Sequence, residues 1–160
     1  MTYQFGSARE LFEAAREASR DAERVRRQLD AMAGRAEGLG GPGFEPRVRS
    51  TPDPDRMGGR VVALVDRESI LRERQAEDYA LIDYANAVLY GHDGHSGLWA
   101  LVGWRADAVA LHYLNDMKWS EVAQALCYSE PHVWQQAQVA LEVADAWGVA
   151  VIGGMGGAED

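Results

Sequence analysis

The chain has 160 residues, of which 47% are hydrophobic, 26% charged and 9% aromatic. These proportions fit one globular domain, or a small domain with a helical appendage. No run approaches the roughly 18 apolar residues that a membrane-spanning helix needs, which excludes an integral membrane protein. No secretory signal is readable at the N-terminus, and the single cysteine, Cys127, allows no internal disulfide. We therefore predict a soluble, cytoplasmic protein that needs no metal or other cofactor.

The net charge of −9 is unevenly distributed along the chain. Residues 1–75 contain 14 arginines and 13 acidic residues, a balance of +1. Residues 76–160 contain one arginine and one lysine against 12 acidic residues, a balance of −10. An acidic half repels phosphate backbones and acidic membranes unless a local basic patch reverses the field.

Glycine and proline divide the chain at three places. Residues 34–58 contain four of the five prolines and predict a linker. Residues 91–97 predict a second break, and the glycine-rich residues 148–160 predict a flexible tail. Between the breaks, apolar residues recur at helical spacing. The sequence thus predicts an all-α fold with an N-terminal helix over 1–33 and a helical domain over 59–147.

The first helix is expected to begin near Ser7, because Glu10 follows three residues later in a capping-box pattern. Its apolar positions alternate in steps of four and three, as in a coiled-coil seam. Two alternatives remain open: a lone amphipathic helix packed on its own bundle, or a homodimer that pairs through this helix. The seam consists of Leu11, Ala15, Ala18, Ala22, Val25, Leu29 and Met32.

Further helices are expected over residues 59–89 and 98–114, followed by a more diagnostic stretch over 109–147. There, a short helix over 119–126 contains the small residue Ala123, which allows close crossing of a second helix. The turn Cys127–Tyr128 leads to Ser129, a predicted N-cap, and Pro131 lies in the following first turn. This pattern predicts a helix-turn-helix.

A resemblance rests on the string Trp119-Ser120-Glu121-Val122-Ala123 and on the residues that follow it. This segment resembles the helix-turn-helix of sigma-70 region 4, and it is more similar still to small phage-associated proteins that carry such a module behind N-terminal helices. The resemblance covers residues 109–141 well and 60–145 loosely. The other residues that carry it are Tyr113, Leu126, Tyr128-Ser129, His132-Val133 and Ala140-Leu141.

The resemblance implies a prophage-type transcription regulator whose helix from Ser129 enters the major groove of DNA, with RNA polymerase as a further partner. Glutamine reads adenine through two hydrogen bonds, and a capped helix start can hold a phosphate. The residues expected at DNA are Lys118, Ser129, Glu130, His132, Trp134, Gln135 and Gln138.

The helix from Ser129 to Trp147 contains no arginine or lysine. Lys118 is therefore the one cation of the helix-turn-helix that could neutralise a DNA phosphate. The alternative is an acidic helix-turn-helix that binds RNA polymerase or a sigma factor without touching DNA. In that case Trp134 is a protein-facing hot spot.

The remaining candidate residues are interpreted structurally. His92 and His95 are expected to be polar loop residues rather than metal ligands, and His112 a buried or boundary residue. Cys127 is expected to be a small packed residue, and core packing is expected to account for most of the five tryptophans. Because no nucleophile elbow, Walker loop or dinucleotide fingerprint is present, we do not expect an enzyme.

Overall fold

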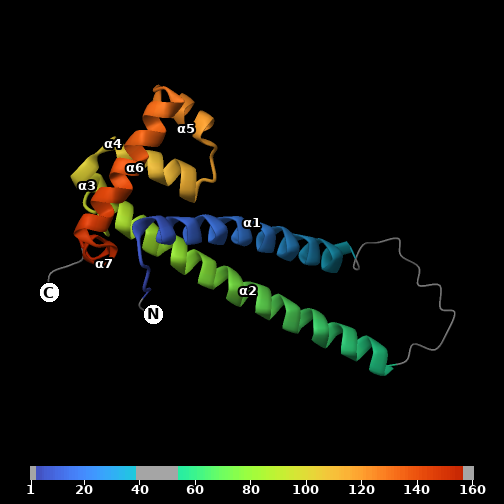
Figure 1. The fold of residues 1–160 in the computed structure, drawn as a ribbon. Helices are drawn as coiled ribbons and strands as arrows, with labels where there is room; N and C mark the ends of the chain where they lie inside the picture. Colours follow the sequence, from blue (N-terminus) through green and yellow to red (C-terminus); the bar gives the residue numbers. More distant parts are fainter. Residues whose placement is uncertain (1–2, 39–53, 157–160) are drawn as a thin grey trace. The chain divides into compact units, whose positions relative to one another are not determined.

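The computed structural model describes residues 3–38 and 54–156. Every regular element in this part of the chain is helical, which confirms the predicted all-α fold (Figure 1). None of the helices in these described residues combines the length and apolar character that crossing a bilayer requires. In chain order the elements are α1 (Ala8–Gly38), α2 (Pro54–Tyr90), α3 (Leu98–Val102), α4 (Trp104–Val109), the π-helical turn η1 (Ala110–Leu114), α5 (Trp119–Leu126), α6 (Glu130–Trp147) and α7 (Val149–Gly153).

Helix α1 begins where the capping pattern predicts. The Ser7 hydroxyl accepts a hydrogen bond from the Glu10 amide at 3.2 Å. The Glu10 carboxylate accepts from the Gly6 amide at 2.8 Å, one residue before the position that a capping box uses. A further acceptor comes from α6, where Asp145 Oδ1 receives the Ala8 amide at 2.6 Å. Amides at this end of the helix are thus satisfied by side chains near and far in sequence.

The prediction of one helix over residues 98–114 is wrong. Gly103 adopts φ 63° and ψ −133°, a conformation outside the right-handed helix, and separates α3 from α4. Beyond Val109 the backbone widens into η1, where the Asn115 amide bonds to the Ala110 carbonyl at 3.1 Å, five residues back. Apolar residues keep their helical spacing across both joints, so the pattern alone does not reveal the breaks.

The fold divides into two compact units. The core unit comprises residues 1–20 and 78–160, and the hairpin unit comprises residues 21–77. In the core unit, the first turns of α1 contribute Leu11, Phe12 and Ala15 to an apolar cluster that draws on every other helix named above. Its fully buried side chains from the later helices include Val88, Leu89, Leu98, Val109, Val122, Val133, Ala137, Ala140, Ala144 and Ile152.

The hairpin unit joins the later part of α1 to the earlier part of α2. The Arg74 guanidinium holds the Asp21 carboxylate through two hydrogen bonds of 2.5 and 2.6 Å. Val25 and Leu71 are buried in the same unit. The predicted seam of α1 is therefore buried within one chain as far as Val25, with Leu29 and Met32 half-buried. Pairing of this helix with a second copy stays a prediction.

Two predicted boundaries differ from the structure. The predicted linker over 34–58 is helical at both ends, because α1 continues to Gly38 and α2 begins at Pro54, and residues 39–53 lie outside the described residues. The predicted flexible tail over 148–160 is wrong for α7. Ile152 is fully buried, and Gly153 lies so close to Val88 that a side chain there would crowd it. Burial of these residues orders the segment, whereas 157–160 lie outside the described residues.

Candidate nucleic-acid interface

Helix α5 ends in a tight turn of three residues before α6 begins. Cys127 adopts a left-handed backbone, with φ 60° and ψ 38°. Its amide bonds to the Gln124 carbonyl at 3.3 Å, and the Tyr128 amide bonds to the Ala123 carbonyl at 3.1 Å. These two bonds form a Schellman motif, in which glycine more often takes the left-handed position. Ser129 then returns to extended backbone and α6 starts at Glu130, so the chain changes direction within three residues (Figure 1).

The buried faces of α5 and α6 consist of small and apolar side chains. Val122 is fully buried, and Ala123 is 5% exposed. Because Ala123 has only a methyl group, it permits close packing of the two helices. The buried residues of α6 recur at helical spacing, namely Val133, Ala137, Ala140, Leu141 and Ala144.

The first turn of α6 faces solvent. Ser129, Glu130 and His132 are exposed, and so are Trp134 and Gln135 one turn further on. Ser129 occupies the predicted N-cap position, but its hydroxyl makes no capping hydrogen bond. The structure thus brings five of the seven residues expected at DNA onto accessible surface of one helix start.

The other two residues expected at DNA are placed differently. Lys118 is the exposed N-cap of α5, where its amide donates to Glu121 Oε2 at 2.8 Å. Gln138 is half-buried, and its amide oxygen accepts a hydrogen bond from the Arg9 guanidinium. Gln138 is therefore bonded within the chain.

Two arginines from other helices bond to side chains of α6. Arg9 reaches Gln138 from α1, and Arg105 reaches the Gln136 amide oxygen from α4. Arg9 lies 129 residues before its partner in the chain, so no local pattern indicates the contact. The cations that contact this helix therefore come from other elements, while Glu130 and Glu142 are exposed on the helix itself.

Aromatic rings support the turn between α5 and α6. Trp104 of α4 stacks on Tyr128 with the ring centroids 4.5 Å apart. The ring centroid of His132 lies 5.3 Å from that of Tyr128 and 5.9 Å from that of Trp104. The Arg105 guanidinium carbon lies 5.6 Å from the centroid of the Trp104 ring. Such contacts hold the turn against α4 while Tyr128 remains 47% exposed.

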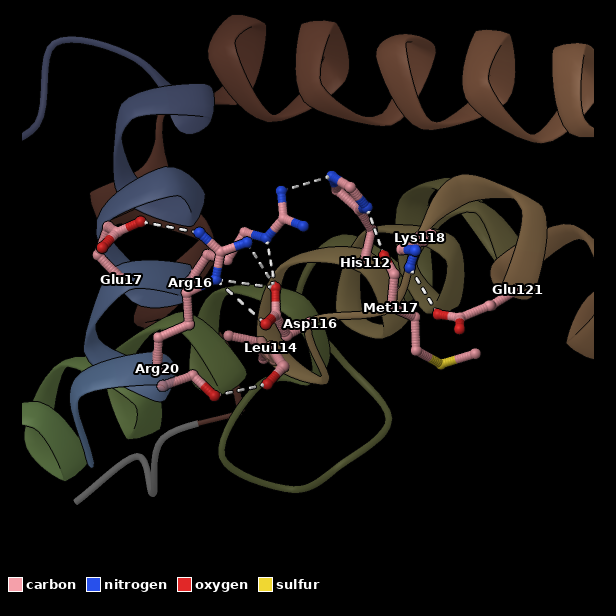
Figure 2. Close-up of polar contacts among 10 residues, drawn as sticks. Arg16, Glu17, Arg20, His112, Leu114, Asp116, Met117, Lys118 and Glu121 are labelled. Atoms are coloured by element: carbon pink, nitrogen blue, oxygen red, sulfur yellow. Dashed lines mark hydrogen bonds and ion pairs between the residues drawn. The ribbon is translucent and has the colours of Figure 1, made fainter. Parts of the chain in front are cut away.

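A polar cluster fixes the loop before α5 to α1 (Figure 2). The Asp116 carboxylate accepts hydrogen bonds from Arg16 Nε at 2.8 Å and from Arg20 Nε at 3.1 Å. The bonds to Arg20 and Arg16 lower the pKa of the Asp116 carboxyl. Ser19 of α1 also donates to the Leu114 carbonyl at 3.1 Å. The start of α5 is thus positioned by α1, although the two are about 100 residues apart in sequence.

His112 is buried, as predicted, and links this cluster to α5. Its Nδ1 lies 2.7 Å from the Met117 carbonyl oxygen, so Nδ1 carries the proton and donates it. Its Nε2 lies 3.3 Å from Arg16 Nη1 and accepts from it. The ring also stacks on Trp119 with centroids 3.9 Å apart. These contacts select the neutral imidazole, because a proton on Nε2 would face the Arg16 guanidinium.

We expect acid to destabilise the fold through His112. Burial lowers the pKa of His112 from its usual value, so the unfolded chain takes up this proton at a higher pH than the folded chain does. The free energy of unfolding therefore falls as the pH drops below about 6.5, the usual pKa of histidine. Urea unfolding at pH 7.5 and 5.5 measures this dependence, which we expect to be smaller in His112→Gln. Exposed His95→Gln is the control and should keep the wild-type dependence; an unchanged dependence in His112→Gln contradicts the prediction.

Two predictions about individual residues are corrected here. Cys127 lies in the turn as expected, but it is exposed rather than packed. Core packing does not account for most tryptophans, because Trp99, Trp134 and Trp147 are 41%, 48% and 52% exposed. Helical spacing alone did not distinguish inward from outward positions for these large side chains.

In the part of the chain that the structure describes, no group of three or more His, Cys, Asp or Glu side chains is arranged to hold a metal ion. His92 and His95 are exposed beside Asp93, whose carboxylate accepts hydrogen bonds from the amides of His95 and Ser96. These bonds lower the pKa of Asp93 to about 2.

No protein-family model, curated protein or solved structure gives a significant match to this chain.

Proposed function

We propose that α5, the three-residue turn and α6 form a helix-turn-helix that binds duplex DNA, and that the chain is a transcription regulator of the prophage type. The observation that carries this proposal is the exposed first turn of α6, which follows a tight turn braced by the buried Ala123. In this class of motif the N-terminal residues of the second helix reach base edges in the major groove. The resemblance to sigma-70 region 4 supports the same function.

The charges around α6 determine how strongly such a module binds. Arg9 and Arg105 bond to α6 and Lys118 is exposed at the start of α5, whereas Glu130 and Glu142 are exposed on α6. Affinity for DNA falls with salt in proportion to the number of phosphates neutralised. With about three phosphates neutralised, the slope of log K against log salt concentration is about −3, which is shallow for a DNA-binding protein.

Selection from a randomised duplex pool at low salt, followed by fluorescence anisotropy, tests the proposal with the full chain. Gln135→Ala removes an exposed amide that can bond adenine through two hydrogen bonds, and we expect it to weaken binding to the selected sequence by about 5- to 150-fold. Random DNA should lose much less affinity. Gln28→Ala is the matched control, since Gln28 is an exposed glutamine in the hairpin unit.

Two outcomes would contradict the proposal. One is the absence of any anisotropy change with random or selected DNA at low ionic strength. The other is a selected sequence whose affinity is the same for wild type and for Gln135→Ala.

A second candidate function is favoured by Trp134, which is 48% exposed on the acidic helix α6. Exposed tryptophans are frequent hot spots of protein interfaces. In this alternative the module binds RNA polymerase or a sigma factor without contacting DNA. Titration of the chain with purified polymerase, with and without its sigma factor, tests the alternative. Loss of binding in Trp134→Ala together with absent DNA binding would favour it over the first proposal.

A further inference from the structure

The surface of the core unit contains a hollow of about 480 Å³. It is lined by side chains from α2, α4, η1 and the end of α5. This volume lies in the range of small-molecule sites, which are about 300–1,000 Å³. Ile82, Leu111 and Leu126 contribute apolar walls. The hollow thus provides an apolar surface against which a small apolar group of a ligand can pack.

Among the described residues, Asp107 is the only charged one that lines the hollow. The Tyr90 hydroxyl donates to Asp107 Oδ1 at 2.7 Å and orients the carboxylate. Burial and this carboxylate raise the pKa of Tyr90, so the phenol stays protonated and keeps donating. The described residues offer this carboxylate no arginine or lysine, and the nearby amides of Asn86 and Asn115 add uncharged acceptors. The charge complement of such a site is a cation.

The backbone beside the hollow is itself unusual. Ala110, Leu111 and Leu114 line it, and all three belong to the π-helical turn η1. Turns of this kind are rare and occur frequently at functional sites, because the extra residue in the turn displaces side chains that a regular helix would align. The shape of the wall and the charge at its edge are independent observations that indicate a ligand.

We propose that this hollow binds a small organic cation, an amine joined to a compact apolar body. The ammonium group bonds to Asp107, and the apolar body lies against Ile82, Leu111 and Leu126. Leu126 is the last residue of α5 and directly precedes the turn to α6. A ligand here therefore touches the helix that braces the proposed DNA-reading turn; this regulatory consequence rests on the proposed function, whereas the binding site does not.

Calorimetric titration of the full chain without DNA tests the site. The probes are 2-phenylethylamine and tryptamine, with the neutral 2-phenylethanol as their counterpart. We expect the amines to bind at least about tenfold more tightly than the alcohol, since a charge-assisted hydrogen bond is lost in the alcohol. Asp107→Asn keeps the size of the side chain and an acceptor for Tyr90, and it should weaken amine binding about tenfold while leaving alcohol binding unchanged. Asp83→Asn, an exposed change outside the hollow, is the control.

Methyl resonances of the wild-type protein give a second measurement that needs no variant. The amines should shift the methyl signals of Ile82, Leu111 and Leu126, and leave those of Leu98, a buried residue outside the lining, unchanged. Equal binding of amine and alcohol, absence of binding by either amine, or shifts confined to other methyl groups would overturn the proposal. Because no DNA is present, failure of DNA binding is a separate result.

Discussion

Phe12→Ala is expected to lower the free energy of unfolding by about 3–5 kcal/mol, the usual cost of removing a buried aromatic ring. Phe12 is fully buried on α1, and its ring lies 6.0 Å from that of Tyr113 in η1. Residues 1–20 belong to the core unit, so the ring fills space in the core rather than on a separate helix. Urea unfolding followed by circular dichroism measures the change.

The matched control for Phe12→Ala is Glu13→Ala, at the next position of the same helix. Glu13 is exposed, and its replacement should change the free energy of unfolding by no more than about 0.5 kcal/mol. If the first turns of α1 formed an independent helix, Phe12→Ala would be nearly neutral as well. A loss below about 1 kcal/mol in Phe12→Ala would therefore show that α1 does not contribute to the core.

Gly97→Ala is expected to cost about 2–5 kcal/mol. Gly97 has φ 72°, and a Cβ there would lie 2.6 Å from the Gly91 amide nitrogen and 2.8 Å from the Val88 carbonyl oxygen. Left-handed strain in alanine contributes about 1–2 kcal/mol, and forced displacement of these backbone atoms adds about 1–3 kcal/mol. Thermal and urea unfolding should both show the loss.

Gly94→Ala separates the two contributions to that loss. Gly94 has φ 79°, close to that of Gly97, but a Cβ there would meet nothing within 4 Å. We expect this variant to lose only the left-handed strain, about 1–2 kcal/mol. Equal losses in both variants would show that the close approach at Gly97 has no energetic consequence.

Local signals in the sequence predict much of the fold. The Ser7 cap locates the start of α1, and the bounds of α5 and α6 follow from the small residue Ala123, the turn at Cys127 and the first-turn proline Pro131. Each of these signals acts within a few residues, where backbone preference and side-chain capping dominate.

The missed features depend on contacts that are distant in sequence. Gly103 breaks a helix, although a glycine inside a helical pattern costs only about 1 kcal/mol and is often tolerated. The order of α7 comes from burial of Ile152 within a glycine-rich stretch. At the candidate interface, exposure of the first turn of α6 followed from its pattern, whereas the placement of Arg9 and Arg105 did not, because partners this far apart leave no periodic signal.

The hydrogen bond from the Ala8 amide to Asp145 has a consequence for how this protein forms during synthesis. The two residues are 137 positions apart, so the ribosome must add 137 residues after Ala8 before the beginning of α1 can gain this acceptor. Closing so long a loop lowers the conformational entropy of the chain before any contact within it forms. Contacts between residues far apart in sequence therefore slow folding. We therefore expect docking of the start of α1 onto α6 to be a late step in folding.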